Sequence, residues 1–226
     1  MVAKITKSKF VFSGKSYFRG GCEDINLVTF GEKKTPIGKP NYLLVAGTIS
    51  AQNLSHANVK VSGPYPIEWE KFADSDVNVN IDYVGVASGD LDFNRKKAES
   101  ANLVLMKLSL GTIALKNLLN NHAAVARNYL KEEGNDARIV SDVWLVMEAK
   151  LASRIETGGS ISVSAPLGTS GFTLEVGGGT SSTTSTKVQI PENTCFAYLL
   201  NKVKKWDKVN GEWMVEELED DTKGLT

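Results

Sequence analysis

Hydrophobic and polar residues alternate strictly from residue 77 to residue 83, so that every second side chain is apolar. A period of two places successive side chains on opposite faces of a β-strand, and this segment is therefore predicted to be a strand with one wet face. Other segments carry the same alternation, or short apolar runs bounded by turn residues. Further strands are predicted at residues 25–28, 42–49, 103–108, 161–165, 172–176, 187–190 and 194–203.

One segment, residues 112–132, repeats its apolar side chains near the 3.6-residue period of an α-helix. Gly134 supplies the signal that ends this helix. From residue 138 to about residue 203 the pattern again indicates strands, with apolar side chains at every second or fourth position up to Ile155 and a turn at residues 158–159. Together these patterns predict an α+β fold, with a twisted antiparallel sheet and a few helices.

The chain has 226 residues, of which 42% are apolar, and this is enough for one large domain with its own core. Its 26 basic and 26 acidic residues balance, which argues against a nucleic-acid partner. The charge is unevenly spread, because residues 1–21 carry only basic groups and residues 212–221 only acidic ones. A basic end can attract anionic lipid or phosphate, but two solvated ends of opposite sign are the plainer interpretation.

The cysteines and the one phosphate-loop-like motif do not predict a binding site. Cys22 and Cys195 lie far apart and lack the spacing of a zinc site, so they are expected to be free thiols in a reducing compartment. The run Ser13–Ser16 contains a Gly-Lys-Ser sequence, but a phosphate loop needs another glycine five positions before the Gly-Lys pair. That position is Lys9, so the motif fails.

The two histidines, His56 and His122, each lack a neighbouring nucleophile with an orienting acid in the sequence. A lone histidine is most often structural. A catalytic triad assembles only in the fold, so the sequence leaves that possibility open. We expect no enzyme activity, no resident metal and no cofactor.

The sequence shows neither a signal peptide nor a run of the ~20 apolar residues that a membrane-spanning helix needs. We therefore expect the protein to be cytoplasmic while soluble. Any later association with a membrane would have to use amphipathic elements.

Two regions, residues 77–108 and 138–200, are long, amphipathic and β-patterned. The first interpretation is an ordinary antiparallel sheet with one exposed face. The second is a pair of hairpins that refold into membrane-crossing strands, each of which needs ~9–11 residues with apolar side chains outward. Pattern alone favours the ordinary sheet.

Three stretches, in the same order along the chain, carry a family resemblance. They are Thr186–Tyr198 with its Ile-Pro turn, Gly134–Val143 with its glycine turn into a strand, and the hairpin from Leu27 to Tyr42 with its Lys-Pro return. Their order and spacing resemble the pore-forming domain of the gasdermin family over roughly residues 22–203. The resemblance is to the bacterial or fungal type, which lacks the large C-terminal inhibitory domain.

The resemblance implies a function in membranes. It implies that residues 1–203 form a gasdermin-like pore-forming domain, that residues 204–226 form a short acidic tail and candidate inhibitory peptide, and that two hairpins insert into the bilayer. Copies of the chain would assemble side by side into a pore, permeabilise the membrane and cause cell death. The implied partners are an anionic lipid bilayer, further copies of the chain and an activating protease. The alternative is a non-enzymatic structural, cargo or assembly protein that shares the fold.

The resemblance also assigns individual residues. The loop Gly31–Lys39 would touch lipid through Ile37, Lys33, Lys34 and Lys39. The first inserted hairpin would use Val77, Val79, Ile81, Tyr83, Leu103 and Leu105. The second would use Val143, Leu145, Met147, Ile161, Val163, Phe172, Leu174 and Val176.

Overall fold

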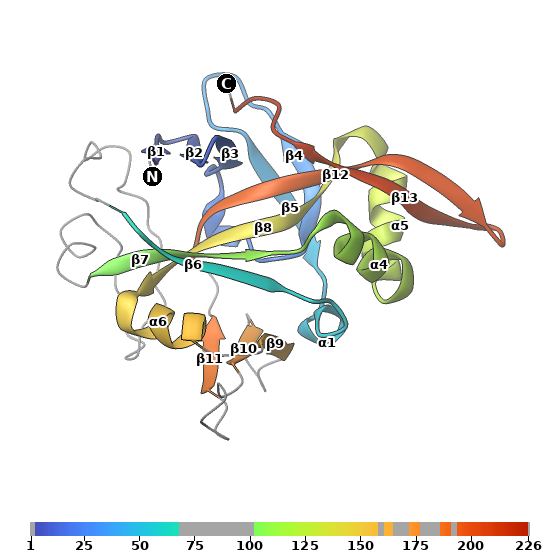
Figure 1. Cartoon of the computed structure of the whole chain (residues 1–226). Helices are drawn as coiled ribbons and strands as arrows, with labels where there is room; N and C mark the ends of the chain where they lie inside the picture. The colour runs from blue at the N-terminus through green and yellow to red at the C-terminus, as the bar shows by residue number, and fades with distance from the viewer. Residues whose placement is uncertain are drawn as a thin grey trace.

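The computed structural model describes residues 3–67, 102–157, 161–164, 172–176, 186–190 and 194–225. Among these residues, ten strands form one curled, half-barrel-like antiparallel sheet with helices packed against it (Figure 1). The main path is β1-β2-β3-β12-β8-β4-β5, while β7 joins β8 to β6, and β13 pairs with β12. The bounds are β1 (Lys4–Ile5), β2 (Lys9–Phe12), β3 (Lys15–Phe18), β4 (Thr29–Lys34), β5 (Tyr42–Thr48), β6 (Lys60–Pro66), β7 (Leu103–Ser109), β8 (Ala137–Glu148), β12 (Cys195–Val209) and β13 (Glu212–Asp221). The α+β class and the mainly antiparallel sheet are confirmed.

Strand β8 is covered on both faces, and every residue in it except Glu148 is buried. Val143 and Leu145 face the larger of two hydrophobic clusters, whereas Trp144 and Val146 face the smaller one. A strand with two buried faces has a near-continuous apolar sequence, and β8 shows this pattern. The sheet therefore has a core on each side.

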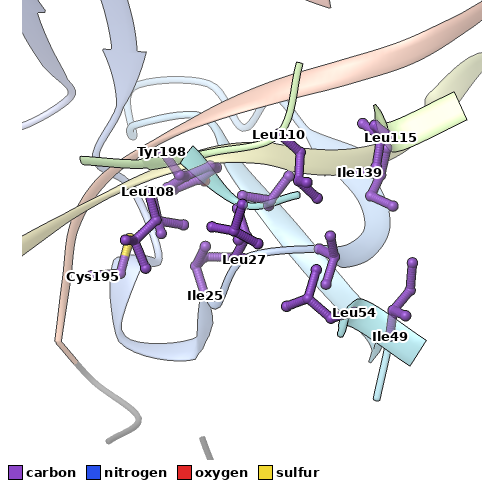
Figure 2. Packing of buried hydrophobic residues seen from close by; sticks show 14 of the residues in the cluster. Ile25, Leu27, Ile49, Leu54, Leu108, Leu110, Leu115, Ile139, Cys195 and Tyr198 are labelled. Atoms are coloured by element: carbon purple, nitrogen blue, oxygen red, sulfur yellow. The ribbon is translucent and has the colours of Figure 1, made fainter. Parts of the chain in front are cut away.

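The larger cluster lies between the sheet and the helices (Figure 2). Ile25 and Leu27, from the loop before β4, meet Leu54 and Leu115 from the helices, and Tyr198 of β12 closes one side. Burying each such side chain stabilises the fold by about 1.5–3 kcal/mol. The helices and 3-10 turns around the sheet are η1 (Cys22–Asp24), α1 (Ala51–Leu54), α4 (Thr112–Asn121), α5 (Ala124–Glu133) and η3 (Gly134–Asp136).

The smaller cluster is mostly aromatic and lies under the β1–β3 meander. The Trp144 ring meets the Phe10 ring edge-on at 5.1 Å between centroids, and Tyr17 at 5.4 Å. Such edge-to-face pairs contribute about 0.5–1.5 kcal/mol beyond the area that they bury. The meander is therefore a lid of aromatic side chains over β7, β8 and β12.

The single helix predicted for residues 112–132 is wrong, because the chain forms α4 and α5 with a break at His122 and Ala123. The His122 amide donates to the Leu118 carbonyl and ends α4, while Ala123 is buried and leaves the helical conformation. The break redirects the chain so that each helix can bury its own apolar side. Gly134 ends α5 with a φ of 64°, as predicted.

The strand predicted to continue from β8 to Ile155 is also wrong, because residues Ala149–Thr157 form helix α6. Leu151, Ala152 and Ile155 are buried, and their spacing suits one face of a helix. The strands predicted beyond it are confirmed, and they form a separate three-stranded antiparallel sheet in the order β11-β10-β9. Its strands are β9 (Ile161–Ser164), β10 (Phe172–Val176) and β11 (Thr186–Ile190).

The front hairpin is displaced from its predicted position. Residues 25–28 are a buried turn and not a strand, and Val28 adopts a φ of 61° while its amide donates to the Val140 carbonyl. The strand begins at Thr29 and includes Gly31–Lys34, which the sequence assigns to a loop. Residues 25–28 carry apolar side chains because this turn is buried, and their spacing resembles that of a strand.

The predicted boundary after Val203 falls inside β12, which continues to Val209 and returns as β13. Asn210 and Gly211 form the turn, with φ values of 53° and 89°. Asn-Gly between two strands is the preferred sequence of a two-residue hairpin turn, and this signal was present in the sequence but missed. Residues 212–221 are therefore an integral strand of the sheet.

Candidate functional site

Four neighbouring strands reach the same end of the sheet. Strand β6 ends at Pro66 opposite Val104 of β7, and β7 begins beside Glu148, the last residue of β8. Strand β12 begins at Cys195, opposite the last part of β8. In the antiparallel order β6-β7-β8-β12, both long connections, 67–102 and 149–194, therefore leave from this one end.

The described part of the second connection is held against the body of the molecule. Helix α6 packs on β6, β7 and β8, and β9 packs on α1 (Figure 1). In β11, Lys187 and Gln189 are exposed while Val188 and Ile190 are buried in the larger cluster. In these described parts, the exposed side chains are polar and the buried ones belong to the larger cluster.

The residues predicted for the inserted hairpins are placed as follows. Leu174 is buried in the larger cluster, as are Val143, Leu145 and Met147. Leu103 pairs with Glu148, so it and Leu105 lie on the opposite face of the sheet and join the smaller cluster. The predicted residues of β8 and those of β7 therefore face opposite sides of the main sheet. Ile161 and Val163 lie in β9, Phe172 and Val176 lie in β10, and Val77, Val79, Ile81 and Tyr83 lie outside the described residues.

The predicted lipid-contact loop is the connection between β4 and β5. Ile37 is fully exposed at its tip, and Gly38 follows with a φ of 71°. Lys39 is exposed, and Lys34 forms an ion pair with Glu32 on the partly exposed strand. The loop therefore presents an aliphatic side chain to solvent with basic groups nearby.

Beside this loop lies an open cavity of about 480 Å³. Lys7 and Lys39 contribute basic groups to its lining, Glu23 and Asp24 contribute acidic ones, and Arg19 is buried at its wall. Leu44 and Val45 of β5 contribute exposed apolar side chains. The cavity therefore combines charges of both signs with exposed apolar area.

Lys33 differs from the prediction, because it is buried and is not available for lipid contact. Its ammonium donates to Asp221 Oδ2 at 2.9 Å and to the Lys223 carbonyl at 2.7 Å, and Arg138 Nε donates to the same carboxylate oxygen at 2.6 Å. The side chain of Lys33 points to the covered face of β4, where the segment after β13 crosses it. The sequence offered no signal for this three-residue cluster, because its members come from distant segments.

Burial, partly offset by the hydrogen bond to Asp221, lowers the pKa of Lys33 below its ordinary value. Burial alone would raise the pKa of Asp221, but the hydrogen bonds from Lys33 and Arg138 outweigh it, so that this pKa lies below its ordinary value. The carboxylate is therefore held ionised between two cations.

The segment after β13 is attached near the base of the same loop. Leu225 is buried, its carbonyl accepts from Lys9 Nζ at 2.9 Å, and Asn41 Nδ2 donates to the Gly224 carbonyl at 3.2 Å. Figure 1 shows the end of the chain beside the β4–β5 loop. Residues 221–225 thus connect β13 to the base of the exposed loop.

The phosphate-loop-like run and the two cysteines have the following surroundings. Ser13 and Gly14 are the turn between β2 and β3, and Lys15 pairs with Asp220 at 2.8 Å. Both cysteines are buried free thiols, and burial raises the pKa of Cys195 well above its ordinary value. Within the described ranges, no group of three or more His, Cys, Asp or Glu side chains could hold a metal ion.

No helix in the described part of the chain is both long enough and apolar enough to cross a membrane. Comparison of the chain with protein-family models, with curated proteins and with solved structures gives no match.

Proposed function

We propose that this chain permeabilises lipid bilayers in the manner of the gasdermin family, by assembling side by side and extending β6, β7, β8 and β12 into the membrane. The observation that carries the proposal is the common end of these four strands, from which both long connections leave. Strands that already pair in register could lengthen without exchanging neighbours. Each connection is longer than the ~20 residues that two crossing strands of ~9–11 residues need.

The pattern of residues 149–156 supports this extension because it suits two conformations. In α6, the apolar Leu151 and Ile155 lie one turn apart and face the body, while Ser153 and Glu156 are exposed. In a strand that continues β8, the odd-numbered residues would share one face, and Ser153 would join Leu151 and Ile155. The same sequence could thus hide its apolar side in solution and present it to lipid.

Neighbouring copies would have to pair along their extended strands, because backbone groups left unpaired in hydrocarbon each cost several kcal/mol. The exposed Ile37 and the basic groups around the β4–β5 loop would make the first contact with an anionic surface. The residues of the first connection, Val77–Tyr83, enter the proposal through their alternating sequence alone.

Dye release from anionic vesicles tests the function directly. We expect release by the purified full chain, at least tenfold less by Ile37→Asp, and near-normal release by the control Val125→Asp. Ile37 and Val125 are both highly exposed aliphatic residues, so neither change should disturb folding. Losing the burial of one isoleucine, about 1.5–3 kcal/mol, accounts for the expected ratio. Absence of release by the full chain would refute the function.

The extension of β8 can be tested with a fluorescent label at Ser153→Cys and, as a matched control, at Glu156→Cys. Both positions are exposed in α6, and the native thiols are buried, so that labelling is selective. On leaking vesicles, a quencher attached to lipid should reduce the fluorescence of the label at position 153 but not that of the label at position 156. Equal quenching of the two labels, or none, would contradict the extended strand. Oligomers that form without lipid, together with no leakage, would favour an assembly protein instead.

A further inference from the structure

The two histidines of the chain, 66 positions apart in the sequence, stack face to face in the structure. Their ring centroids are 4.2 Å apart and the ring planes differ by 11°. His56 follows α1, and His122 ends α4. A chain with only two imidazoles thus brings both to one place, and neither the fold nor the proposed membrane function requires this.

The backbone of both residues is anchored while their rings are exposed. The His56 amide donates to the Asn53 carbonyl at 3.1 Å, and the His122 amide donates to the Leu118 carbonyl at 2.9 Å. Within the part of the chain that the structure describes, neither imidazole forms a side-chain hydrogen bond or ion pair. A ligand from solution can therefore bind their ring nitrogens at the cost of the ring stack alone.

The rings stand at the edge of an open cavity of about 460 Å³. Thr112, Asn58 and Asn117 add neutral oxygen-bearing side chains to its lining, and Lys60 is the one formally charged residue among the described lining residues. The centroid separation of 4.2 Å puts both imidazoles within reach of one ion. Because the lone pair of a ring nitrogen lies in the plane of its ring, the two exposed and nearly parallel rings must turn out of the stack to direct one nitrogen of each to a shared ion at ~2.0–2.1 Å.

We propose that His56 and His122 form a two-imidazole site for a divalent transition-metal ion of the class that imidazole prefers: copper, nickel or zinc. Copper(II) binds such ligands most tightly in the divalent series. Because no third strong ligand is present among the described lining residues, water completes the coordination sphere. The ion would tie the segment between α1 and β6 to the end of α4. The site is independent of the proposed membrane function.

Titration of the full chain with copper(II), followed by calorimetry and by electron paramagnetic resonance, tests the site. We expect one ion per chain with hyperfine splitting from two imidazole nitrogens. His56→Gln and His122→Gln should each weaken binding at least tenfold, because one imidazole remains as a single ligand, and the double variant should lose the site. Circular dichroism melts would confirm that these exposed substitutions leave the fold intact.

A second pair of variants examines the cavity. Lys60→Gln removes the positive charge beside the ion and should tighten binding, whereas Lys4→Gln, an equivalent change on β1, should leave the affinity unchanged. Single histidine variants within twofold of the original affinity, or a spectrum with fewer than two imidazole nitrogens, would overturn the site. Equal effects of the two lysine variants would show that the ion binds away from this cavity.

Discussion

Strand β12 passes through two different environments. From Cys195 to Asn201 every residue is buried, between β8 and the aromatic lid. From Lys202 to Val209 the strand pairs only with β13, and Val203 and Trp206 are only partly buried against the larger cluster. On the exposed face of this outer half, lysines pair with glutamates across the two strands. The strand is thus buried on both faces in its first half, whereas its second half has one partly buried face and one face of exposed charges.

The two halves also differ in the kind of ion pair that they use. The exposed ladder consists of flexible side chains in water, where screening and side-chain entropy cancel most of the attraction. Asp221, at the inner end of β13, is instead buried with Lys33 and Arg138. We therefore expect the stability of the hairpin to be concentrated at its inner end. The following predictions, from the largest effect to the smallest, test this difference.

Replacing an aromatic ring in the inner half should have the largest effect. Phe196 is fully buried, its ring lies 5.4 Å from that of Phe10, and the Arg19 guanidinium stands over it. Phe196→Ala should lower the free energy of unfolding by about 3–5 kcal/mol, because it leaves a cavity. Urea denaturation measures this, with the exposed outer-half Val209→Ala as control. An equal loss of unfolding free energy in the two variants would contradict the proposed difference between the halves.

Removing the buried carboxylate should come next. Asp221→Asn leaves Lys33 and Arg138 without their shared anion and should cost about 3 kcal/mol at neutral pH. Because the folded pKa of Asp221 is below its unfolded value, its contribution is complete above the ordinary carboxyl pKa of about 3.9 and is lost as the pH falls through the folded value.

The pH dependence separates this cluster from other acid-sensitive groups. Stability measured from pH 7 to pH 2 should converge for Asp221→Asn and the original chain as the pH falls. A constant difference in unfolding free energy between the two chains over that range would mean that the substitution acts through packing and not through the lost carboxylate charge.

The turn of the outer half should have a moderate effect. Gly211 has a φ of 89° and nothing near its missing Cβ, so Gly211→Ala is strained only in its backbone. We expect a loss of about 1 kcal/mol, seen as faster amide exchange in the outer parts of β12 and β13. Gly211→Asn should lose less, since asparagine adopts this conformation more readily. Faster exchange that spreads to the inner half would show that the two halves unfold together.

The exposed ladder should have the smallest effect. Lys204 donates to Glu217 at 2.7 Å, and both side chains are about half exposed. Lys204→Gln should leave the free energy of unfolding unchanged within error, in low and in high salt. A clear, salt-sensitive loss would mean that the ladder contributes to stability as a network.

Elements with a local cause could be predicted from the sequence, whereas contacts with a long-range cause could not. Residues 172–176 and 187–190 were recognised as strands because their pattern is local. Residues 149–157 were assigned to a strand because apolar residues two and four apart suit both a strand and a helix. Asn210 and Gly211 carried a local turn signal, so this hairpin was predictable in principle. Lys33 was not, because its burial depends on Asp221, almost two hundred residues away.

The sequence by itself determined the α+β class, most strands, the end of α5 and the amphipathic character of the two long regions. These properties depend on neighbouring side chains and on the fixed periods of helix and strand. Only the tertiary structure decided that four strand ends meet at one edge, that Lys33 is buried, and that His56 and His122 stack. Such contacts join segments whose separation along the chain carries no periodic signal, so they arise only when the sheet closes around its two cores.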